Sequence, residues 1–160
     1  MDNPGKVKMV DQTQDTERRR AWMSLLAKAP EADLLALWAA YDAAPGFDWL
    51  RAPEAGGVMV RARLGGTGAP FNMGEMTVTR CSVALKDGTV GHAYIQGRSK
   101  PKAEAAALID ALMQTDAAAD VQGRILAPLG NLMAERRQAR AAKAAATKVD
   151  FFTMVRGENA

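Results

Sequence analysis

The segment that decides the fold is residues 61–112, RARLGGTGAPFNMGEMTVTRCSVALKDGTVGHAYIQGRSKPKAEAAALIDAL. It contains a strand-like stretch, a glycine-rich loop, a hairpin turn at Asp87-Gly88 and a helix that opens at Ser99-Lys100-Pro101. Helical patterns flank this segment on both sides. The sequence therefore predicts an α+β fold with an N-terminal helical hairpin, a mainly antiparallel sheet of about four strands, then helices and an extended apolar C-terminal tail.

Four strands are expected. Phe47 and Trp49 alternate with polar neighbours as far as Pro53, which is typical of a short edge strand. The second strand has a core-facing set and a basic opposite set. The core-facing set is Val58, Val60, Ala62 and Leu64, and the opposite set is Met59, Arg61 and Arg63. The third strand, residues 75–85, changes apolar phase, which predicts a bulge near Arg80, and residues 89–96 form the fourth strand.

Two helices are predicted before the sheet. The first starts at Asp15 and the second follows Pro30, and their close spacing predicts that they pack antiparallel. Their apolar stripes are Trp22, Leu25, Leu26 and Ala29, then Leu34, Leu37, Trp38 and Tyr41. Residues 1–14 show no periodicity and are predicted to be a flexible arm. Residues 15–148 are expected to form a single domain.

The C-terminal third changes character twice. A short segment, residues 121–126, is predicted to break at Pro128, with a helix restarting near Asn131. Residues 134–148 are basic and lack a large apolar side chain. An apolar tail, residues 149–160, follows, and its density predicts that it is covered, either by the sheet of this chain or by another subunit. The basic helix before it resembles an arm that carries the tail outward, which favours another subunit. The expected partner-docking residues are Val149, Phe151, Phe152, Met154, Val155 and Arg156.

Composition limits the class of protein. The formal net charge of +3 is too small to indicate nucleic acid by itself. The single cysteine, Cys81, excludes an internal disulfide and fits a reducing compartment, where a buried thiol is common. No apolar run is long enough to span a membrane, and the first 14 residues lack a secretory signal, so a cytoplasmic location is expected.

The glycine-rich loop, residues 65–74, is one candidate phosphate site. Its four glycines allow backbone N–H groups to converge on an anion, and basic residues flank it in sequence. The candidate ligand-binding residues are Arg63, Gly65, Gly66, Thr67, Gly68 and Arg80. No Walker lysine follows and no helix opens directly after the loop, so neither nucleotide fingerprint is met. The alternative is a wide connection that glycine permits.

A second candidate surrounds the start of the helix at residue 100. Ser99 is the expected N-cap, and Ala105, Leu108, Ile109 and Leu112 are the expected core face. Arg98, Lys100 and Lys102 cluster where the helix dipole disfavours cations, which suggests that an anion or an acidic partner arrives there. The alternative is that three solvated bases tolerate a small cost.

Catalytic and metal-binding residues are not expected. His92 is the only histidine, so neither a histidine-based triad with a spare base nor a two-histidine zinc site can be built. On its strand it is expected to be a packed or surface residue. Glu75 borders the glycine loop but has no nearby acidic partner in sequence. An autonomous enzyme is therefore disfavoured.

Several motifs together resemble the PhnG family, the G subunit of the bacterial carbon-phosphorus lyase system for phosphonate degradation. They are residues 63–68 (RLGGTG), Gly74 with residues 77–80, residues 96–98 (QGR), residues 107–114 (ALIDALMQ) and residues 149–157 (VDFFTMVRG). The resemblance covers nearly the whole chain from Trp22 onward, and the closing segment is its most specific part.

The resemblance implies a role in phosphonate activation. It implies that the chain acts with H-, I- and L-type subunits to displace adenine from ATP with a phosphonate, giving α-D-ribose 1-phosphonate 5-triphosphate. Catalysis would lie in the I-type subunit. It further implies a core assembly with two copies each of the G-, H-, I- and J-type subunits. The iron-sulfur cluster and S-adenosylmethionine would belong to the J-type subunit, since one cysteine cannot hold a cluster.

Three classes of function are thus weighed. The leading hypothesis is an interaction subunit whose tail and basic helix dock on partners, while the glycine loop and residues 96–102 line a surface near a triphosphate. The second is a stand-alone phosphate- or nucleotide-binding module. The third, nucleic-acid binding through the basic helix, is disfavoured because the helix has no interleaved aromatic residues.

Overall fold

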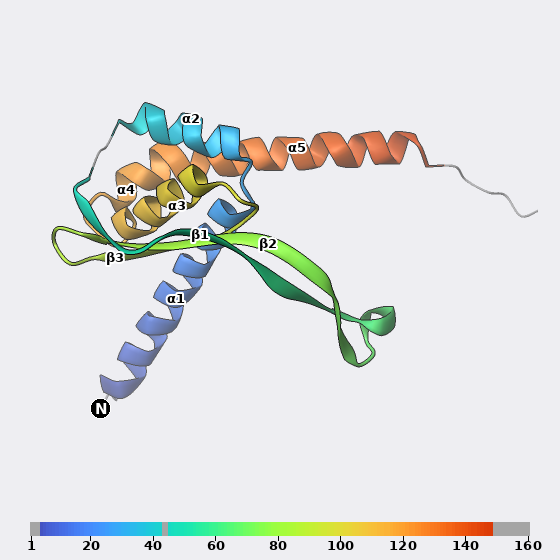
Figure 1. The fold of residues 1–160 in the computed structure, drawn as a ribbon, viewed down its shortest axis with the longest axis horizontal. Coiled ribbons are helices and arrows are strands. Elements are labelled where there is room, and N and C mark those ends of the chain that lie inside the picture. The colour runs from blue at the N-terminus through green and yellow to red at the C-terminus, as the bar shows by residue number, and fades with distance from the viewer. Residues whose placement is uncertain (1–3, 43–44, 149–160) are drawn as a thin grey trace, which may run out of the picture.

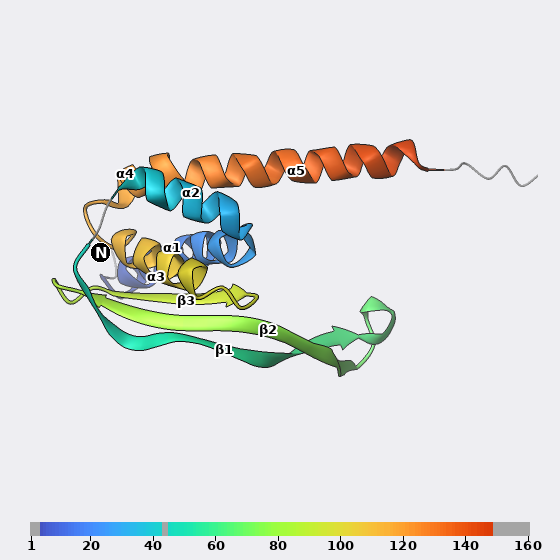
Figure 2. The same cartoon turned by 45° about the horizontal axis from the view of Figure 1, so that its top comes forward.

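The computed structural model describes residues 4–42 and 45–148 and places side chains from Gln14 onward. Within these residues the chain forms two helices, three strands and a second group of helices. The helices lie on one side of the sheet (Figure 2). The predicted α+β class is confirmed.

The sheet has three strands rather than about four. They are β1 (Phe47–Arg63), β2 (Pro70–Leu85) and β3 (Val90–Gln96), antiparallel and in the order β1-β2-β3. The two stretches expected on either side of Pro53 form one continuous strand. Because β1 lies at an edge, the missing N–H of this proline costs no ladder hydrogen bond in the sheet interior. The register of β1 against β2 shifts on both sides of Arg51, first between Trp49 and Arg51 and again between Arg51 and Glu54.

β1 and β2 continue beyond β3 as a two-stranded ribbon. β3 pairs with β2 from Val78 to Ala84, whereas β1 pairs with β2 as far as Arg63 opposite Pro70. We call residues 57–77 the ribbon. It projects from the body of the domain, and the glycine loop lies at its tip (Figures 1 and 2).

The side chains of residues 58–63 in β1 alternate between the two faces of the strand, as predicted. The expected core-facing set, however, is not buried in the core. Val58, Val60 and Ala62 are half-buried, while Met59 is exposed. Leu64, expected in the core, is 76% exposed. The reason is position along the sheet, since the helices cover β2 and β3 in the body and the ribbon extends past them (Figure 1).

The phase change in β2 is a change of face, and β2 lacks the predicted bulge near Arg80: the register shift opposite Arg80 lies on β1, between Arg51 and Glu54. Residues 78–84 pair with β3 in regular register. Cys81, Val83 and Leu85 belong to the core cluster beneath the helices. Val78 is buried outside that cluster, since it lies on the opposite face of the pleated strand. The irregularity on β2 lies near Met73 instead.

Helix α3 (Lys100–Leu112) forms the centre of the core. The side chain of Ser99 accepts a hydrogen bond from the backbone N–H of Lys102 at 3.2 Å, and Pro101 lies in the first turn, so the predicted cap is confirmed. The predicted core residues are all buried, namely Ala105, Leu108, Ile109 and Leu112. The helix packs on β2 and β3, and both N-terminal helices pack on it.

The N-terminal helices differ from the prediction in length and packing. α1 (Pro4–Lys28) begins well before Asp15, so residues 4–14 of the predicted arm are helical. Proline suits the first helical position, and the lysine, methionine and glutamine residues that follow are strong helix formers, which offsets the missing apolar stripe. α2 is Glu31–Tyr41, as expected. α1 packs on β3 and α3, and α2 packs on α3 and the turn that precedes α5, so the predicted antiparallel pairing of the two helices is wrong.

The C-terminal helices run without the predicted break at Pro128. α4 (Ala118–Val121), a π-helical turn η2 (Gln122–Leu126) and α5 (Ala127–Ala146) follow one another directly. The backbone N–H of Ala127 bonds to Gln122, and this wider turn places Pro128 in the first turn of α5, where no donor is needed.

α5 leaves the body of the domain, as its composition predicted. Residues 134–146 are exposed, and the helix projects outward (Figure 1). Near its base Arg136 donates to both carboxylate oxygens of Asp33 in α2, which fixes its direction. The predicted docking tail, residues 149–160, lies outside the described residues. None of the described helices combines the length and apolarity that a bilayer crossing demands.

Candidate functional site

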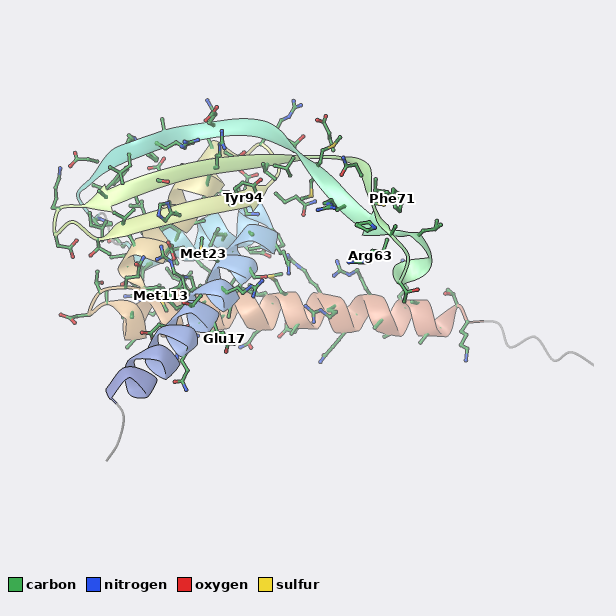
Figure 3. The ribbon with its side chains drawn as sticks, turned by 90° about the horizontal axis from the view of Figure 1, so that it is seen from below. Glu17, Met23, Arg63, Phe71, Tyr94 and Met113 are labelled. Carbon is green, nitrogen blue, oxygen red and sulfur yellow. The ribbon has the colours of Figure 1, made fainter. Side chains whose placement is uncertain are left out.

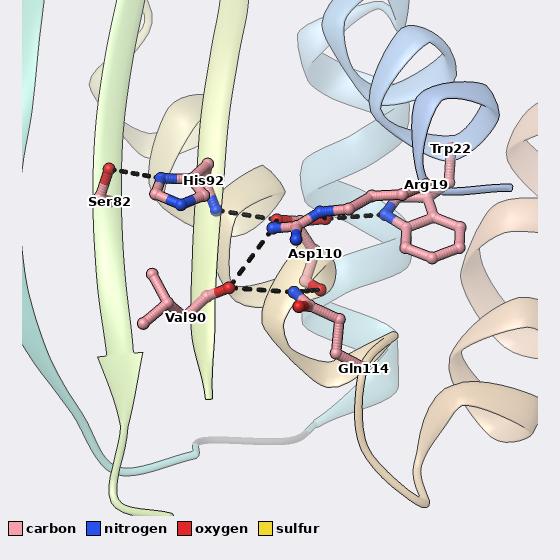
Figure 4. A network of polar contacts seen from close by, with 7 residues as sticks. All are labelled: Arg19, Trp22, Ser82, Val90, His92, Asp110 and Gln114. Carbon is pink, nitrogen blue, oxygen red and sulfur yellow. Dashed lines mark hydrogen bonds and ion pairs between the residues drawn. The ribbon is translucent and has the colours of Figure 1, made fainter. Parts of the chain in front are cut away.

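Asp110 organises the contact between α1, α3 and β3 (Figure 4). Its side chain is completely buried. The carboxylate accepts hydrogen bonds from Arg19 at 2.7 and 3.2 Å, from the indole N–H of Trp22 at 2.8 Å and from the backbone N–H of His92 at 2.9 Å. The charge is therefore fully compensated, and the residue anchors α1 and β3 on α3.

The same cluster also covers part of the outer edge of β3, the edge that pairs with no other strand of the described sheet. The carbonyl oxygen of Val90 accepts from the side-chain amide of Gln114 at 2.9 Å and from Arg19 at 3.4 Å. Covering an edge strand in this way protects it from pairing with other chains. Sequence reasoning did not single out this cluster. The available signal was one acidic residue inside the otherwise apolar run 105–112.

The sheet face opposite the helices carries polar and charged side chains. His92 lies on the surface of β3, as expected, with its Nδ1 2.8 Å from the hydroxyl of Ser82. Glu54 lies 3.6 Å from both Arg51 and Arg80. Arg80 and Tyr94 border a small hollow of about 90 Å³. These pairs are exposed, so each contributes little to stability.

The glycine loop turns through a 3₁₀ turn, η1 (Leu64–Gly66), at the ribbon tip. Gly65 and Gly66 have φ angles of 60° and 83°, which side chains other than glycine rarely adopt. The backbone N–H of Gly68 bonds to Leu64 at 2.8 Å, and the guanidinium of Arg63 donates to the carbonyl of Gly68 at 3.1 Å. Arg63 thus closes the loop on itself. Thr67 is exposed beside it.

Arg80 does not border this loop. It lies opposite Glu54 in the register of the sheet, whereas the loop begins after Arg63 opposite Pro70. Ten residues of extended strand separate positions 70 and 80, which is roughly 30 Å. The premise that Arg63 and Arg80 flank one anion site is therefore wrong, because the hairpin is much longer than the loop.

Two residues of the predicted basic cluster, Arg98 and Lys102, line a hollow of about 240 Å³ at the start of α3. The hydroxyl of Ser99 donates to the carboxylate of Glu31 at 2.6 Å, which brings a negative charge to this end. Lys102 is buried, and its ammonium donates to the carbonyl of Ala27 at 3.1 Å. Burial lowers the pKa of Lys102, and Glu31 opposes that shift.

The positive charge of Lys102 at the N-terminus of α3 is compensated within the chain. Glu31 and the carbonyl of Ala27 compensate the base that the helix dipole disfavours. Arg98 and Lys100 are exposed. The structure does not bring them near the glycine loop, since the two regions occupy the body and the ribbon tip. A role for either region in binding phosphate stays a prediction.

An apolar groove lies between α1 and β3. It has a volume of about 490 Å³, and Met23 and Tyr94 lie on its two sides (Figure 3). Leu26, Ile95 and Ala106 supply apolar lining, with Arg19 and Arg20 also present. Its wall is mostly apolar, so it offers surface for packing and few groups for polar recognition.

Cys81 is a structural thiol. It is buried and donates to the carbonyl of Ala103 at 3.1 Å. Burial, together with the charge of Glu104, raises the pKa of the thiol from 9.0 to about 11. Because the thiolate is the reactive form, this position is unsuited to nucleophilic chemistry. Among the side chains that the structure places, residues 14–42 and 45–148, no three of the metal-binding types lie together.

Comparison with known proteins identifies the family. Residues 17–157 match the family model described as phosphonate metabolism protein PhnG. A protein of Rhizobium meliloti (strain 1021), named alpha-D-ribose 1-methylphosphonate 5-triphosphate synthase subunit PhnG, is 47% identical over 143 residues, which are 89% of this chain and 91% of the relative. The resemblance drawn from the sequence motifs is confirmed. The chain belongs to the PhnG family of phosphonate metabolism proteins.

Proposed function

We propose that this protein is a subunit of the phosphonate-activating carbon-phosphorus lyase complex. In that role it supports formation of α-D-ribose 1-phosphonate 5-triphosphate and adenine from ATP and an alkylphosphonate such as methylphosphonate. The observation that carries the proposal is the 47% identity, over nearly the full length of both chains, to a protein named as a subunit of alpha-D-ribose 1-methylphosphonate 5-triphosphate synthase.

The chemistry of the described residues favours a supporting role over catalysis. The buried carboxylate of Asp110 is fully hydrogen-bonded, the thiol of Cys81 has a raised pKa, and His92 pairs with a serine at the surface. Asp110 and Cys81 are therefore not poised as a general base or a nucleophile, and among the described residues no third side chain bonds the His92 ring to orient it toward Ser82. The family resemblance implies that catalysis lies in the I-type partner.

The proposed partners are the H-, I-, J- and L-type subunits, with two copies of this chain in a cytoplasmic core complex. ATP is the substrate of the complex, and this chain holds no cofactor of its own. The iron-sulfur cluster and S-adenosylmethionine belong to the J-type subunit, where the carbon-phosphorus bond is cleaved. These assignments extend the family resemblance and rest on the same observation.

Reconstitution tests the proposal. The purified H-, I- and L-type subunits are incubated with ATP and methylphosphonate, with and without this chain, and adenine release is followed. We expect release to require this chain. ATP is also titrated into the isolated chain. Tight saturable binding there, with no effect on adenine release, would favour the stand-alone phosphate-binding module and would overturn the subunit assignment.

Deleting residues 149–160 is expected to prevent copurification with the I-type partner, because the deletion removes all six predicted docking residues at once. The apolar side chains in it are Val149, Phe151, Phe152, Met154 and Val155. The measurement is a pull-down from cells that coexpress both chains. The matched control deletes only residues 157–160, which leaves those side chains in place and should keep the partner bound. Assembly that survives the longer deletion would show that the tail is not the docking element.

A further inference from the structure

The ribbon exposes several large apolar side chains to solvent. Four of the seven large hydrophobic side chains that are exposed among the described residues belong to the ribbon and its tip. They are Met59 (57%), Leu64 (76%), Phe71 (44%) and Met73 (65%). Two-stranded ribbons without a third strand or a helix over one face are only marginally stable in water. A surface of this kind is typical of a site that another molecule covers.

The ribbon is also basic. Residues 57–77 contain two basic residues, Arg61 and Arg63, and one acidic residue, Glu75, which lies opposite Met59. Arg63 is held by the carbonyl of Gly68, and Arg61 has no ionic partner within the described part of the chain. The apolar side chains and the two guanidinium groups therefore lie on one projecting element, on which Figure 3 labels Arg63 and Phe71.

A second basic arm projects on the same side of the body. The outer part of α5 carries Arg137, Arg140 and Lys143, all exposed, against the single acid Glu135. Figures 1 and 2 both show α5 and the ribbon leaving the body in the same direction. One partner surface could thus meet both arms, and charge complementarity requires that surface to be acidic.

We infer that the ribbon inserts into an apolar cleft with an acidic rim on a partner protein subunit, with Phe71 as an anchor, Arg61 facing a carboxylate on the rim and α5 as a second basic contact. The inference rests on the proposed function, since it requires a complex. A protein fits better than a nucleic acid because three of the four exposed apolar side chains are aliphatic, whereas single strands are bound by stacked aromatic rings. A second copy of this chain would bring its own basic arms toward these arginines.

The test uses the full-length chain, tagged and coexpressed with the H-, I- and J-type subunits. Phe71→Asp should lower the amount of copurified partner about tenfold or more, as expected for an aromatic anchor in a desolvated pocket. Arg61→Glu should lower it about threefold at low salt and less at high salt, because screening weakens the lost attraction. The matched control is Leu50→Asp, a residue 60% exposed on the same strand within the body, which should change recovery by less than about twofold.

Hydrogen exchange supplies a readout that folding defects cannot imitate. In the wild-type complex the amides of residues 57–76 should exchange at least about tenfold more slowly than in the isolated chain. Thermal unfolding of each isolated variant reports whether the body remains intact, which is expected because the ribbon lies outside the core cluster.

The results separate the docking role of the ribbon from the proposed function. Partner recovery that is equal for Phe71→Asp and Leu50→Asp, with unchanged exchange in the ribbon, would overturn the inference and leave the proposed function standing. A wild-type chain that recovers no partner would overturn both. Retention of RNA that Arg61→Glu abolishes, or a stable dimer of the isolated chain that Phe71→Asp dissociates, would also overturn it.

Discussion

Replacing Gly91 with alanine is expected to destabilise the domain by about 3 kcal/mol or more, at the upper end of what overpacking usually costs. Gly91 is buried where β3 meets α3. A Cβ atom built there would lie 2.0 Å from the carbonyl oxygen of Ala107 and 2.7 Å from the backbone nitrogen of Ala111. The obstacle is helix backbone, which cannot move without separating α3 from the sheet. Glycine at this position therefore allows α3 to pack this closely on β3.

Chemical denaturation of the purified chain, followed by circular dichroism, measures this effect. The matched control is Gly130→Ala in α5, where an added Cβ meets nothing within 4 Å. Alanine should stabilise that helical position by about 0.5–1 kcal/mol. The two substitutions are chemically identical and have opposite expected signs. Equal free energies of unfolding for the two variants would show that the close approach at Gly91 is not a structural constraint.

Replacing Asp110 with alanine is expected to cost about 3 kcal/mol, within the range for removing one partner of a buried ion pair. The change leaves the guanidinium of Arg19, the indole N–H of Trp22 and the backbone N–H of His92 without their acceptor. Each unsatisfied buried donor carries a desolvation penalty. α1 should then loosen from β3, since this carboxylate joins the two elements.

The free energy of unfolding and hydrogen exchange at β3 report this loss. Asp110→Asn keeps the shape and one acceptor oxygen, so it should fall between the wild type and alanine. Asp116→Ala is the control, because Asp116 is exposed just after α3 and should change stability by less than about 0.5 kcal/mol. A cost at Asp110 no larger than at Asp116 would contradict the anchoring role.

The elements with strong local signals were predicted from sequence. Helix α3 has a capping serine, a proline in its first turn and a regular apolar face, and each of these signals acts over a few residues. The hairpin turn at Asp87-Gly88 is equally local: the backbone N–H of Gly88 bonds to Leu85, and Gly88 has a φ of 89°. Family membership was predicted for the same reason, since motifs are read directly from the chain.

The candidate site was predicted less well, because it depended on distances between segments. Arg63 and Arg80 are close to the glycine loop in sequence, but strand register separates Arg80 from it. Lys102 was expected either to meet an anion or an acidic partner or to be one of three solvated bases, whereas the fold buries it and its ammonium donates to the carbonyl of Ala27. No pattern in a single sequence reports which segment will cover which.

The sequence by itself determined the α+β class, the capped helix α3, the strand-forming segments, the basic composition of α5 and the family. Each of these follows from propensity, periodicity or motif, which are properties of neighbouring residues. Tertiary structure alone decided that the sheet has three strands, that β1 and β2 extend into a ribbon, that α1 and α2 pack on α3, and that Asp110 and Gly91 join α1 and β3 to α3. These features depend on register and on the burial of one element by another. Such long-range choices are made by the balance of packing and hydrogen bonding across the whole domain.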